Sequence, residues 1–232
     1  MDWQPAQKPA EMAESRLLDG ILSGHFLINT TLPGERELSE QIGVTRPTLR
    51  EALQRLGRDG WLDIQQGKAT RVRDYWHEGS MAVLSVLAQS PTHQPPDFVV
   101  HLLEIRVLLA PAYAREAIQA APDEITSLLE NYAMLDNIPS VFAQADWELH
   151  HLLTQFAPNP VFRLLLNSFH AIYHLVGEEY FAFPECRASS RAFYNDLLSC
   201  ARRAADDEAE TLTRRVMRES LTLWQKMQKE NQ

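Results

Sequence analysis

Side chains with the chemistry to bind DNA gather in one short stretch of the sequence, "GVTRPTLREALQRLGRDGW". An arginine guanidinium is a planar fork that can donate to O6 and N7 of one guanine, and a threonine hydroxyl suits a phosphate or a base edge. With about 100° per residue, a helix places Arg46 and Arg50 on one flank near its N-terminus. The N-terminal residues of a recognition helix reach DNA. We therefore predict that Arg46 and Arg50 contact DNA.

Two further arginines of this stretch, Arg55 and Arg58, fall on the other side of the same helix, toward its C-terminal end. Charged side chains on an exposed helix face commonly lie in solvent or pair with neighbouring charges. Glu51 and Asp59 are suitable partners. We expect Arg55 and Arg58 to be solvated or paired rather than bound to DNA.

The elements that must position these arginines follow one another in a definite order. Three segments have apolar residues at helical spacing: 10–23, 35–42, and a helix that Thr45 or Arg46 caps, with Pro47 in its first turn. Gly43 ends the second helix, so the link to the third is very short. Two β-prone pieces follow, 61–64 and 70–72, joined by "QQGKA". This order predicts a winged helix-turn-helix domain, in which the third helix enters the major groove and the hairpin is the wing.

Other polar residues occupy the DNA-facing positions of such a domain. Thr45 and Thr48 carry hydroxyls at the start of the third helix, and Arg36 stands where the second helix crosses the DNA backbone. The wing tip combines a hydrogen-bonding side chain, a glycine and a cation, which suits a minor groove. The predicted DNA-binding set is Arg36, Thr45, Arg46, Thr48, Arg50, Gln66, Gly67 and Lys68.

Charge is distributed unevenly along a chain whose net charge is -9. Residues 36–73 hold eight Lys or Arg and five Asp or Glu, whereas the part after residue 76 holds twelve against twenty. The charge of the contacting surface, not the total, attracts phosphate. After residue 76 every periodic segment has a helical pattern. We predict a mainly α protein: a winged helix-turn-helix domain over 1–76, and an all-α antiparallel bundle of six to seven helices over 77–232.

Several other classes of protein are not expected. No apolar run approaches the roughly 18 residues of a membrane span, and the first residues lack the basic and apolar regions of a secretory signal. We therefore expect a cytoplasmic protein in which Cys186 and Cys200 are free thiols. No Ser/His/Asp order, phosphate loop or dinucleotide fingerprint is present, so we do not expect an enzyme.

The stretch "LPGERELSEQIGVTRPTLREALQRLGRDGWLDIQQGK" resembles the DNA-binding domain of the GntR family of bacterial repressors. The shared motifs are the P-x-E-R-E-L-[SA] opening, "GV[TS]R", "LREAL" and "GWL" at the start of the wing. A longer resemblance, through "LNSFHAIYHLVGEEYFAFPECR" and "RESLTLWQKMQK", is to the FadR-type regulators of fatty-acid metabolism within this family. It implies a homodimer on a palindromic operator that represses fatty-acid degradation and activates unsaturated fatty-acid synthesis. Long-chain acyl-CoA would release the DNA, and no cofactor is implied.

The resemblance also implies a set of acyl-CoA-binding residues: Arg106, Tyr173, Tyr180, Glu219, Ser220, Trp224 and Lys229. Their chemistry is suitable, because an acyl-CoA needs cations for its phosphates, an apolar slot for its chain and hydroxyls near its thioester. From the residues alone, ordinary core positions are the favoured interpretation of the aromatic members of this set.

Four positions depart from the best-known FadR-type regulator. Pro47 stands in place of a threonine and Gln66 in place of a wing histidine, so we expect altered fine preference with retained DNA binding. Val216 and Met217 replace a tyrosine and a glycine at the expected pocket edge. These two replacements bear on chain-length preference and on the response to ligand.

Many GntR-family regulators with an all-helical body bind a metal through an Asp-x-x-x-His pair and further histidines, and use it to hold small carboxylates. This chain has that pair, Asp146 and His150, and more histidines lie nearby: His151, His170 and His174. The later helices, where the remaining ligands belong, offer Tyr194, Asn195, Glu219 and Ser220 in place of histidine. We expect no metal, and a metal-dependent, carboxylate-responsive regulator is the alternative.

Overall fold

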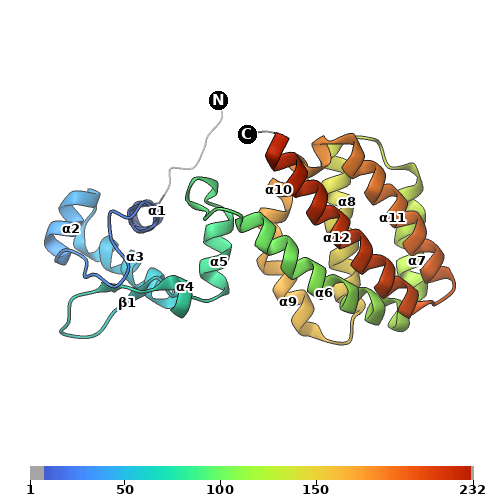
Figure 1. Cartoon of the computed structure of the whole chain (residues 1–232). Helices are drawn as coiled ribbons and strands as arrows, with labels where there is room; N and C mark the ends of the chain where they lie inside the picture. Colours follow the sequence, from blue (N-terminus) through green and yellow to red (C-terminus); the bar gives the residue numbers. More distant parts are fainter. Residues whose placement is uncertain (1–7, 231–232) are drawn as a thin grey trace, which may run out of the picture. The chain divides into compact units, whose positions relative to one another are not determined.

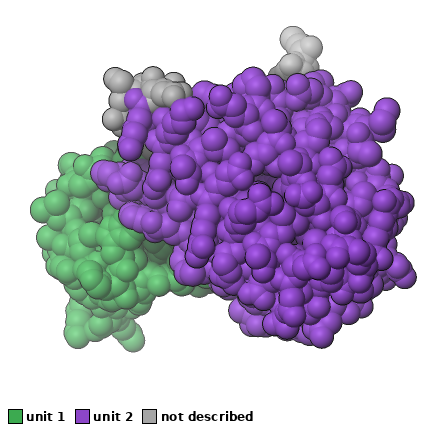
Figure 2. Space-filling model, turned by 45° about the vertical axis from the view of Figure 1, so that its right-hand side comes forward, with its two compact units in different colours: residues 1–93 green, residues 94–232 purple. Residues whose placement is uncertain are grey.

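The computed structural model describes residues 8–230, apart from the side chains at 91, 171, 174, 175 and 230. The chain divides into two compact units, Met1–His93 and Gln94–Gln232, which Figure 2 colours separately. The boundary predicted after residue 76 falls inside a short helix of the first unit, α4 (Tyr75–Glu78). The next helix, α5 (Met81–Ala88), also belongs to the first unit.

The first three helices of this unit are α1 (Pro9–Leu22), α2 (Glu35–Ile42) and α3 (Arg46–Asp59) (Figure 1). Their apolar stripes meet in a core that contains Leu17, Leu38 and Leu49, none of which is exposed. Thr45 caps α3 by accepting a hydrogen bond from the backbone N–H of Thr48. The three predicted helices and the predicted cap are confirmed.

The wing is a small antiparallel hairpin. Strand β1 (Leu62–Asp63) pairs with β2 (Arg71–Val72), with Leu62 opposite Val72. An isolated bridge from Thr31 to Arg71 adds a third backbone segment beside it. Gly67, at the tip, has a φ of +76°, which glycine adopts without the strain that other residues incur. The predicted hairpin is confirmed.

The segment after the wing packs back onto the first unit. The Tyr75 ring of α4 lies 4.9 Å from the Trp61 ring, measured between centroids. Gly79 follows α4 so closely that a Cβ atom there would collide with the backbone carbonyl of Tyr75. Glycine is therefore required sterically at the turn between α4 and α5.

The second unit is a bundle of helices, drawn from green to red in Figure 1. Its described residues form seven α-helices: α6 (Phe98–Ala120), α7 (Pro122–Asn131), α8 (Pro139–Phe156), α9 (Pro160–Ser168), α10 (His170–Ala182), α11 (Pro184–Arg202) and α12 (Asp206–Glu230). Helix α12 lies along α6, α10 along α8, and α11 beside α7 and α12. The predicted all-α domain is confirmed, but eight α-helices, α5 to α12, begin among the described residues of the predicted range 77–232, one more than the six to seven predicted.

Details of the bundle differ from the sequence pattern in one place. The periodic segment from Pro160 to Phe181 is divided at Phe169 into α9 and α10. The break predicted near residues 205–207 is confirmed, because α11 ends at Arg202. Cys186 and Cys200 are buried free thiols, as predicted. In the part of the chain that the structure describes, no helix is long and apolar enough to span a bilayer.

Candidate nucleic-acid interface and ligand cavity

The start of α3 presents unpaired cations to solvent. The side chains of Arg46, in the first turn of α3, and Arg36, in α2, are exposed, and neither makes a side-chain hydrogen bond or ion pair with any described residue. Both guanidiniums are therefore available to a phosphate or a base edge. The short link that begins at Gly43, which is in the left-handed conformation, brings α2 and α3 together at this end.

The side chains of Thr45 and Thr48 make hydrogen bonds within the first turn of α3. Their hydroxyl oxygens lie 2.8 Å apart, and the Thr45 hydroxyl also accepts from the Thr48 backbone N–H at 3.4 Å. This pair fixes the first turn of α3, and so the direction in which Arg46 leaves the helix. Contacts of these hydroxyls with DNA stay a prediction.

The other three arginines of α3 are all paired. Arg55 bonds Glu51 at 2.7 Å and lies 3.6 Å from Glu14 of α1, and Arg58 bonds Asp59 at 3.0 Å, so the expectation for these two is confirmed. Arg50 differs from the expectation of a free DNA contact. Its Nε and Nη2 atoms both lie 2.7 Å from one carboxylate oxygen of Glu35, the first residue of α2.

At the wing tip the three predicted residues, Gln66, Gly67 and Lys68, are all exposed. The Lys68 ammonium donates to the side-chain oxygen of Gln65 at 2.7 Å. This contact holds the cation against the hairpin and leaves its other two N–H groups available. A cation, a glycine and a side-chain amide are therefore all exposed at the tip, as the prediction of a contact with a DNA minor groove requires.

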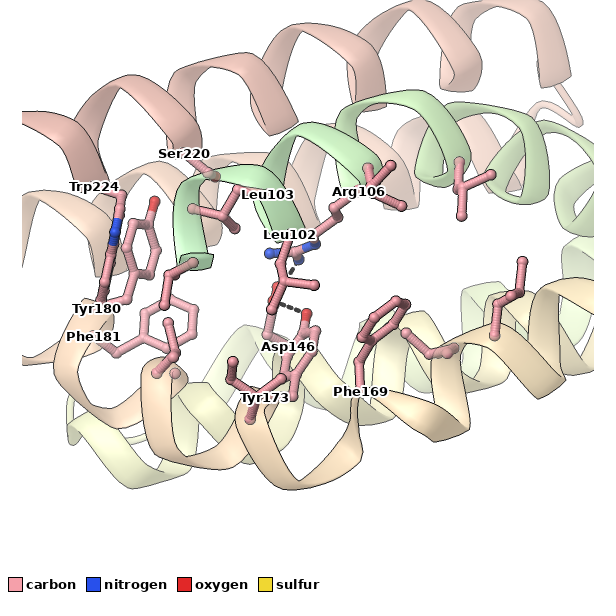
Figure 3. Close-up of a pocket in the computed structure, with 18 of the residues that line it drawn as sticks. Leu102, Leu103, Arg106, Asp146, Phe169, Tyr173, Tyr180, Phe181, Ser220 and Trp224 are labelled. Atoms are coloured by element: carbon pink, nitrogen blue, oxygen red, sulfur yellow. Dashed lines mark hydrogen bonds and ion pairs between the residues drawn. The ribbon is translucent and has the colours of Figure 1, made fainter. Parts of the chain in front are cut away.

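The second unit contains an elongated cavity between α6, α9, α10 and α12 (Figure 3). It encloses about 900 Å³, its open mouth included. Aliphatic and aromatic side chains form most of its wall: Val99, Leu102, Leu103, Ile105, Leu109, Phe162, Leu165, Leu166, Phe169, Ile172, Val176, Phe181 and Trp224. In Figure 3, Trp224 and Tyr180 lie toward one end and Phe169 toward the other, with Arg106 and Asp146 between them. The shape and lining suit an apolar ligand with a polar group.

A buried ion pair forms the polar part of the cavity wall. Arg106 of α6 donates from Nη2 to the Asp146 carboxylate of α8 at 2.7 Å, and its guanidinium carbon lies 5.2 Å from the centre of the Tyr173 ring. Asp146 also accepts from the Tyr173 hydroxyl at 2.6 Å and from the Tyr194 hydroxyl at 3.0 Å. Three donors therefore satisfy a carboxylate that is only 4% exposed.

His150, one turn after Asp146, extends this cluster. Its Nε2 lies 2.6 Å from the same Nη2 of Arg106, and its Nδ1 lies 2.7 Å from the Tyr113 hydroxyl. Since a guanidinium can only donate, Nε2 accepts and the ring proton resides on Nδ1, which donates to the Tyr113 oxygen. The imidazole is therefore neutral and locked in one tautomer.

The electrostatics agree with this geometry. Burial, reinforced by the Arg106 guanidinium, lowers the pKa of His150 to about 3. Burial, the largest single influence, would raise the pKa of Asp146, but the Arg106 charge and the hydrogen bonds from Tyr173 and Arg106 together outweigh burial, and the pKa is lowered. Burial raises the pKa of Tyr173 well above its ordinary value, so its hydroxyl stays protonated and keeps donating. The cluster thus holds one cation, one anion and neutral partners at neutral pH.

Comparison with known proteins decides the family. Residues 9–72 match the model of bacterial regulatory proteins of the gntR family, and residues 73–231 match the FadR C-terminal domain. Proteins named fatty acid metabolism regulator protein in Salmonella paratyphi B and Salmonella newport are each 38% identical over 224 residues, which cover 97% of this chain and 94% of each relative. The chain is a FadR-type member of the GntR family.

A solved structure shares the fold of this FadR-type chain at a much lower identity. It is that of Lar, which controls the expression of the Listeria monocytogenes agr system, with a TM-score of 0.58 and 17% identity over 95% of this chain and 98% of that one. Membership of the GntR family makes this chain a DNA-binding transcriptional regulator and not an enzyme.

Most, but not all, of the predicted ligand residues meet in the cavity of the FadR-type domain. Its wall includes five of them: Arg106, Tyr173, Tyr180, Ser220 and Trp224. Glu219 and Lys229 are exposed on α12 and are not part of the wall. Val216 and Met217, placed by sequence at the pocket edge, are buried in the core and do not line the cavity.

Asp146 and His150 suggested the alternative of a metal-binding regulator. In this chain both side chains contact an arginine instead. Nη2 of Arg106 lies between the Asp146 carboxylate and the His150 imidazole. Among the residues that the structure describes, no group of three or more His, Cys, Asp or Glu is arranged for a metal; the side chain of His174 lies outside them. A guanidinium therefore supplies the positive charge between these two residues.

Proposed function

We propose that this chain is a homodimeric regulator of fatty-acid metabolism, acting in the cytoplasm, that leaves a palindromic operator when long-chain acyl-CoA binds. The observation that carries the proposal is the apolar cavity in a domain whose relatives are named fatty acid metabolism regulator protein. In this role it represses fatty-acid degradation and activates unsaturated fatty-acid synthesis. It uses no cofactor.

The chemistry of the cavity supports an acyl chain with a polar head. Each methylene transferred from water to an apolar wall stabilises a complex by about 0.8 kcal/mol. Two buried donor groups in the wall, Nε of Arg106 and the hydroxyl of Tyr180, have no hydrogen-bond partner among the described residues. A thioester carbonyl is an acceptor that would satisfy one of them. Lys229, an exposed cation on α12, is suited to a phosphate of the coenzyme.

Release of DNA follows from linkage between the two sites. The DNA-competent dimer holds its recognition helices about 34–36 Å apart, one turn of duplex. Acyl-CoA binds better to a state with a different separation, so by reciprocity the operator weakens acyl-CoA binding by the same factor. Helix α6 carries Val99, Leu103 and Arg106 of the cavity wall and directly follows the segment that leads out of the first unit. A ligand that displaces α6 therefore also displaces the segment that joins α6 to the first unit.

A calorimetric titration with acyl-CoAs of increasing length tests the ligand. We expect affinity to rise roughly 15-fold for each two-carbon extension until the cavity is full, since two methylenes contribute about 1.6 kcal/mol. Coenzyme A, free fatty acid, and Zn²⁺ with citrate are the comparison arms. An affinity independent of chain length, or a response to Zn²⁺ with citrate alone, would rule the proposal out.

Tyr180→Phe tests the ligand site with little change in packing. Because the buried hydroxyl makes no hydrogen bond of ordinary geometry with the described residues, although Ser220 and Cys186 lie near it, its loss should leave thermal stability nearly unchanged and weaken acyl-CoA binding about fivefold. Unchanged affinity would remove Tyr180 from the ligand site. Trp224→Ala is the stronger perturbation, but Trp224 is 4% exposed and its truncation also costs roughly 3–5 kcal/mol of stability.

Operator duplexes selected by the protein from a random pool test the DNA side. Arg46→Ala should abolish specific binding and leave acyl-CoA affinity intact. Arg58→Ala is the matched control, because Arg58 is an arginine of the same helix that pairs with Asp59. Equal losses in the two variants would argue against a recognition role for Arg46. Equal acyl-CoA affinity with and without operator would exclude the linkage.

A further inference from the structure

Arg50 is paired with a carboxylate, that of Glu35, whereas Arg36 and Arg46 have no acidic partner among the described residues. Nε and Nη2 of Arg50 both lie 2.7 Å from Oε2 of Glu35, fifteen residues earlier in the chain. The pair is formed by the packing of α2 against α3. Both side chains are largely exposed, at 62% for Arg50 and 42% for Glu35, so the contact lies on the protein surface.

Glu35 occupies only one edge of the Arg50 guanidinium. Of its five N–H groups, Nε–H donates to the carboxylate, and Nη2 lies 2.7 Å from the same oxygen on the same edge. The other N–H of Nη2 and one N–H of Nη1 form the end-on edge, which makes no contact with the described residues. An end-on fork of this kind donates to O6 and N7 of a guanine. The carboxylate can therefore fix the plane of the guanidinium while the open edge meets a base.

The same contact reduces the attraction of Arg50 for phosphate. Sequence-independent affinity for DNA comes from cations that neutralise phosphates and release counterions. An arginine whose charge is already balanced contributes less to that affinity. Arg36 and Arg46, without an acidic partner among the described residues, keep their full charge.

We propose that Glu35 is a specificity-determining residue. By binding the Nε edge of Arg50, it lowers the affinity of this arginine for phosphates in general and orients the guanidinium so that it binds a base. The proposal rests on the DNA-binding role proposed above for Arg50. Glu35 acts through Arg50, as a positioning residue, and needs no contact of its own with DNA.

The test compares Glu35→Gln with Glu37→Gln. Glu37 lies in the same first turn of α2, and its replacement changes the net charge equally, but its side chain bonds Gln41 instead of an arginine. Affinities for the selected operator and for a random duplex of equal length are measured at several salt concentrations. In Glu35→Gln the random duplex should bind more tightly, with a salt slope steeper by about 0.9. The ratio of operator to random affinity should fall roughly 2- to 10-fold, the effect of freeing one side chain.

Glu37→Gln should change both affinities together and leave their ratio intact. The proposal is overturned if the ratio in Glu35→Gln matches that in Glu37→Gln. Because both affinities come from one preparation, a partly unfolded variant lowers both and does not imitate the expected result.

Arg50→Gln distinguishes failure of this proposal from failure of its premise. If Arg50→Gln leaves operator affinity unchanged, Arg50 is not a DNA contact and the proposed role of that residue fails. If Arg50→Gln weakens operator binding while Glu35→Gln keeps the ratio of the native protein, the role of Glu35 alone fails. In the Arg50→Gln background, Glu35→Gln should behave like Glu37→Gln.

Discussion

His150 makes the stability of the second unit depend on pH in a range where carboxylates do not titrate. It is fully buried, and it bonds Arg106 through Nε2 and Tyr113 through Nδ1. Asp146 and Tyr173 are the other titratable groups that face it. Burial, followed by the charge of Arg106, lowers its pKa from 6.5 to about 3. The folded chain therefore keeps His150 neutral at a pH at which the unfolded chain protonates it.

The size of the effect follows from this difference in pKa. The unfolded state binds more protons below pH 6.5, so the free energy of unfolding falls as the pH falls from about 6.5 toward 3. Between pH 7.5 and 5.5 the contribution of His150 decreases by about 1.4 kcal/mol, since protonation of the unfolded histidine changes by about a factor of ten. This value is insensitive to the folded pKa as long as that pKa stays well below 5.5.

Urea unfolding followed by far-ultraviolet circular dichroism measures the effect, at fixed protein concentration and at pH 7.5 and 5.5. His150→Gln is the reference variant, because glutamine can accept and donate hydrogen bonds but does not titrate. The other histidines, including His151, are common to both proteins, so their contributions cancel. We expect the native chain to lose about 1.4 kcal/mol more than the variant over this range. A difference below about 0.5 kcal/mol would refute a neutral, buried His150.

Three further substitutions have defined outcomes. Asp146→Asn leaves the Arg106 charge unpaired in a buried site and should cost about 3–5 kcal/mol in urea unfolding at pH 7.5; a cost below about 1 kcal/mol would contradict the buried pair. Thr45→Ala removes the N-cap of α3 and should cost about 1 kcal/mol, measured by amide exchange in α3, whereas Thr45→Ser should be neutral. Gly79→Ala drives a methyl group into the Tyr75 carbonyl and should lower the stability of the first unit by about 1–3 kcal/mol in thermal melts; unchanged melting would contradict the close approach.

Local signals explain why the first unit was predictable from sequence. Gly43, Thr45 and Pro47 each act on the backbone within a few residues of themselves, so the turn and the start of α3 follow from residue types alone. The pairing of Arg50 with Glu35 was missed because these residues lie on different helices, and their distance depends on how α2 packs against α3. Sequence identified the cations of α3 but not which of them was already paired.

In the cavity of the second unit, even more of the contacts between helices could not be predicted from the sequence. Arg106 and Tyr173 were predicted only through the family resemblance, and their common partner Asp146 was considered only for a metal. The i, i+4 spacing of Asp146 and His150 correctly placed both on one face of α8. The residue that meets them comes from α6, forty positions earlier, which no local pattern reveals. Tyr113 carried no sequence signal, and Tyr194 was noted only because it stands where a metal-binding relative would have a ligand.

An arginine held by a carboxylate occurs at both proposed sites, and burial decides how easily a ligand can separate each pair. The Arg50–Glu35 pair is exposed, and water competes with it, so a guanine can engage Arg50 at little energetic cost. The Arg106–Asp146 pair is buried, with side chains 19% and 5% exposed, and separating it without replacement is expensive. A ligand that disturbs the buried pair must supply hydrogen bonds in its place, and an acyl chain alone offers none. For the proposed acyl-CoA ligand, the thioester end carries an acceptor, and its position should therefore control whether the second unit changes state.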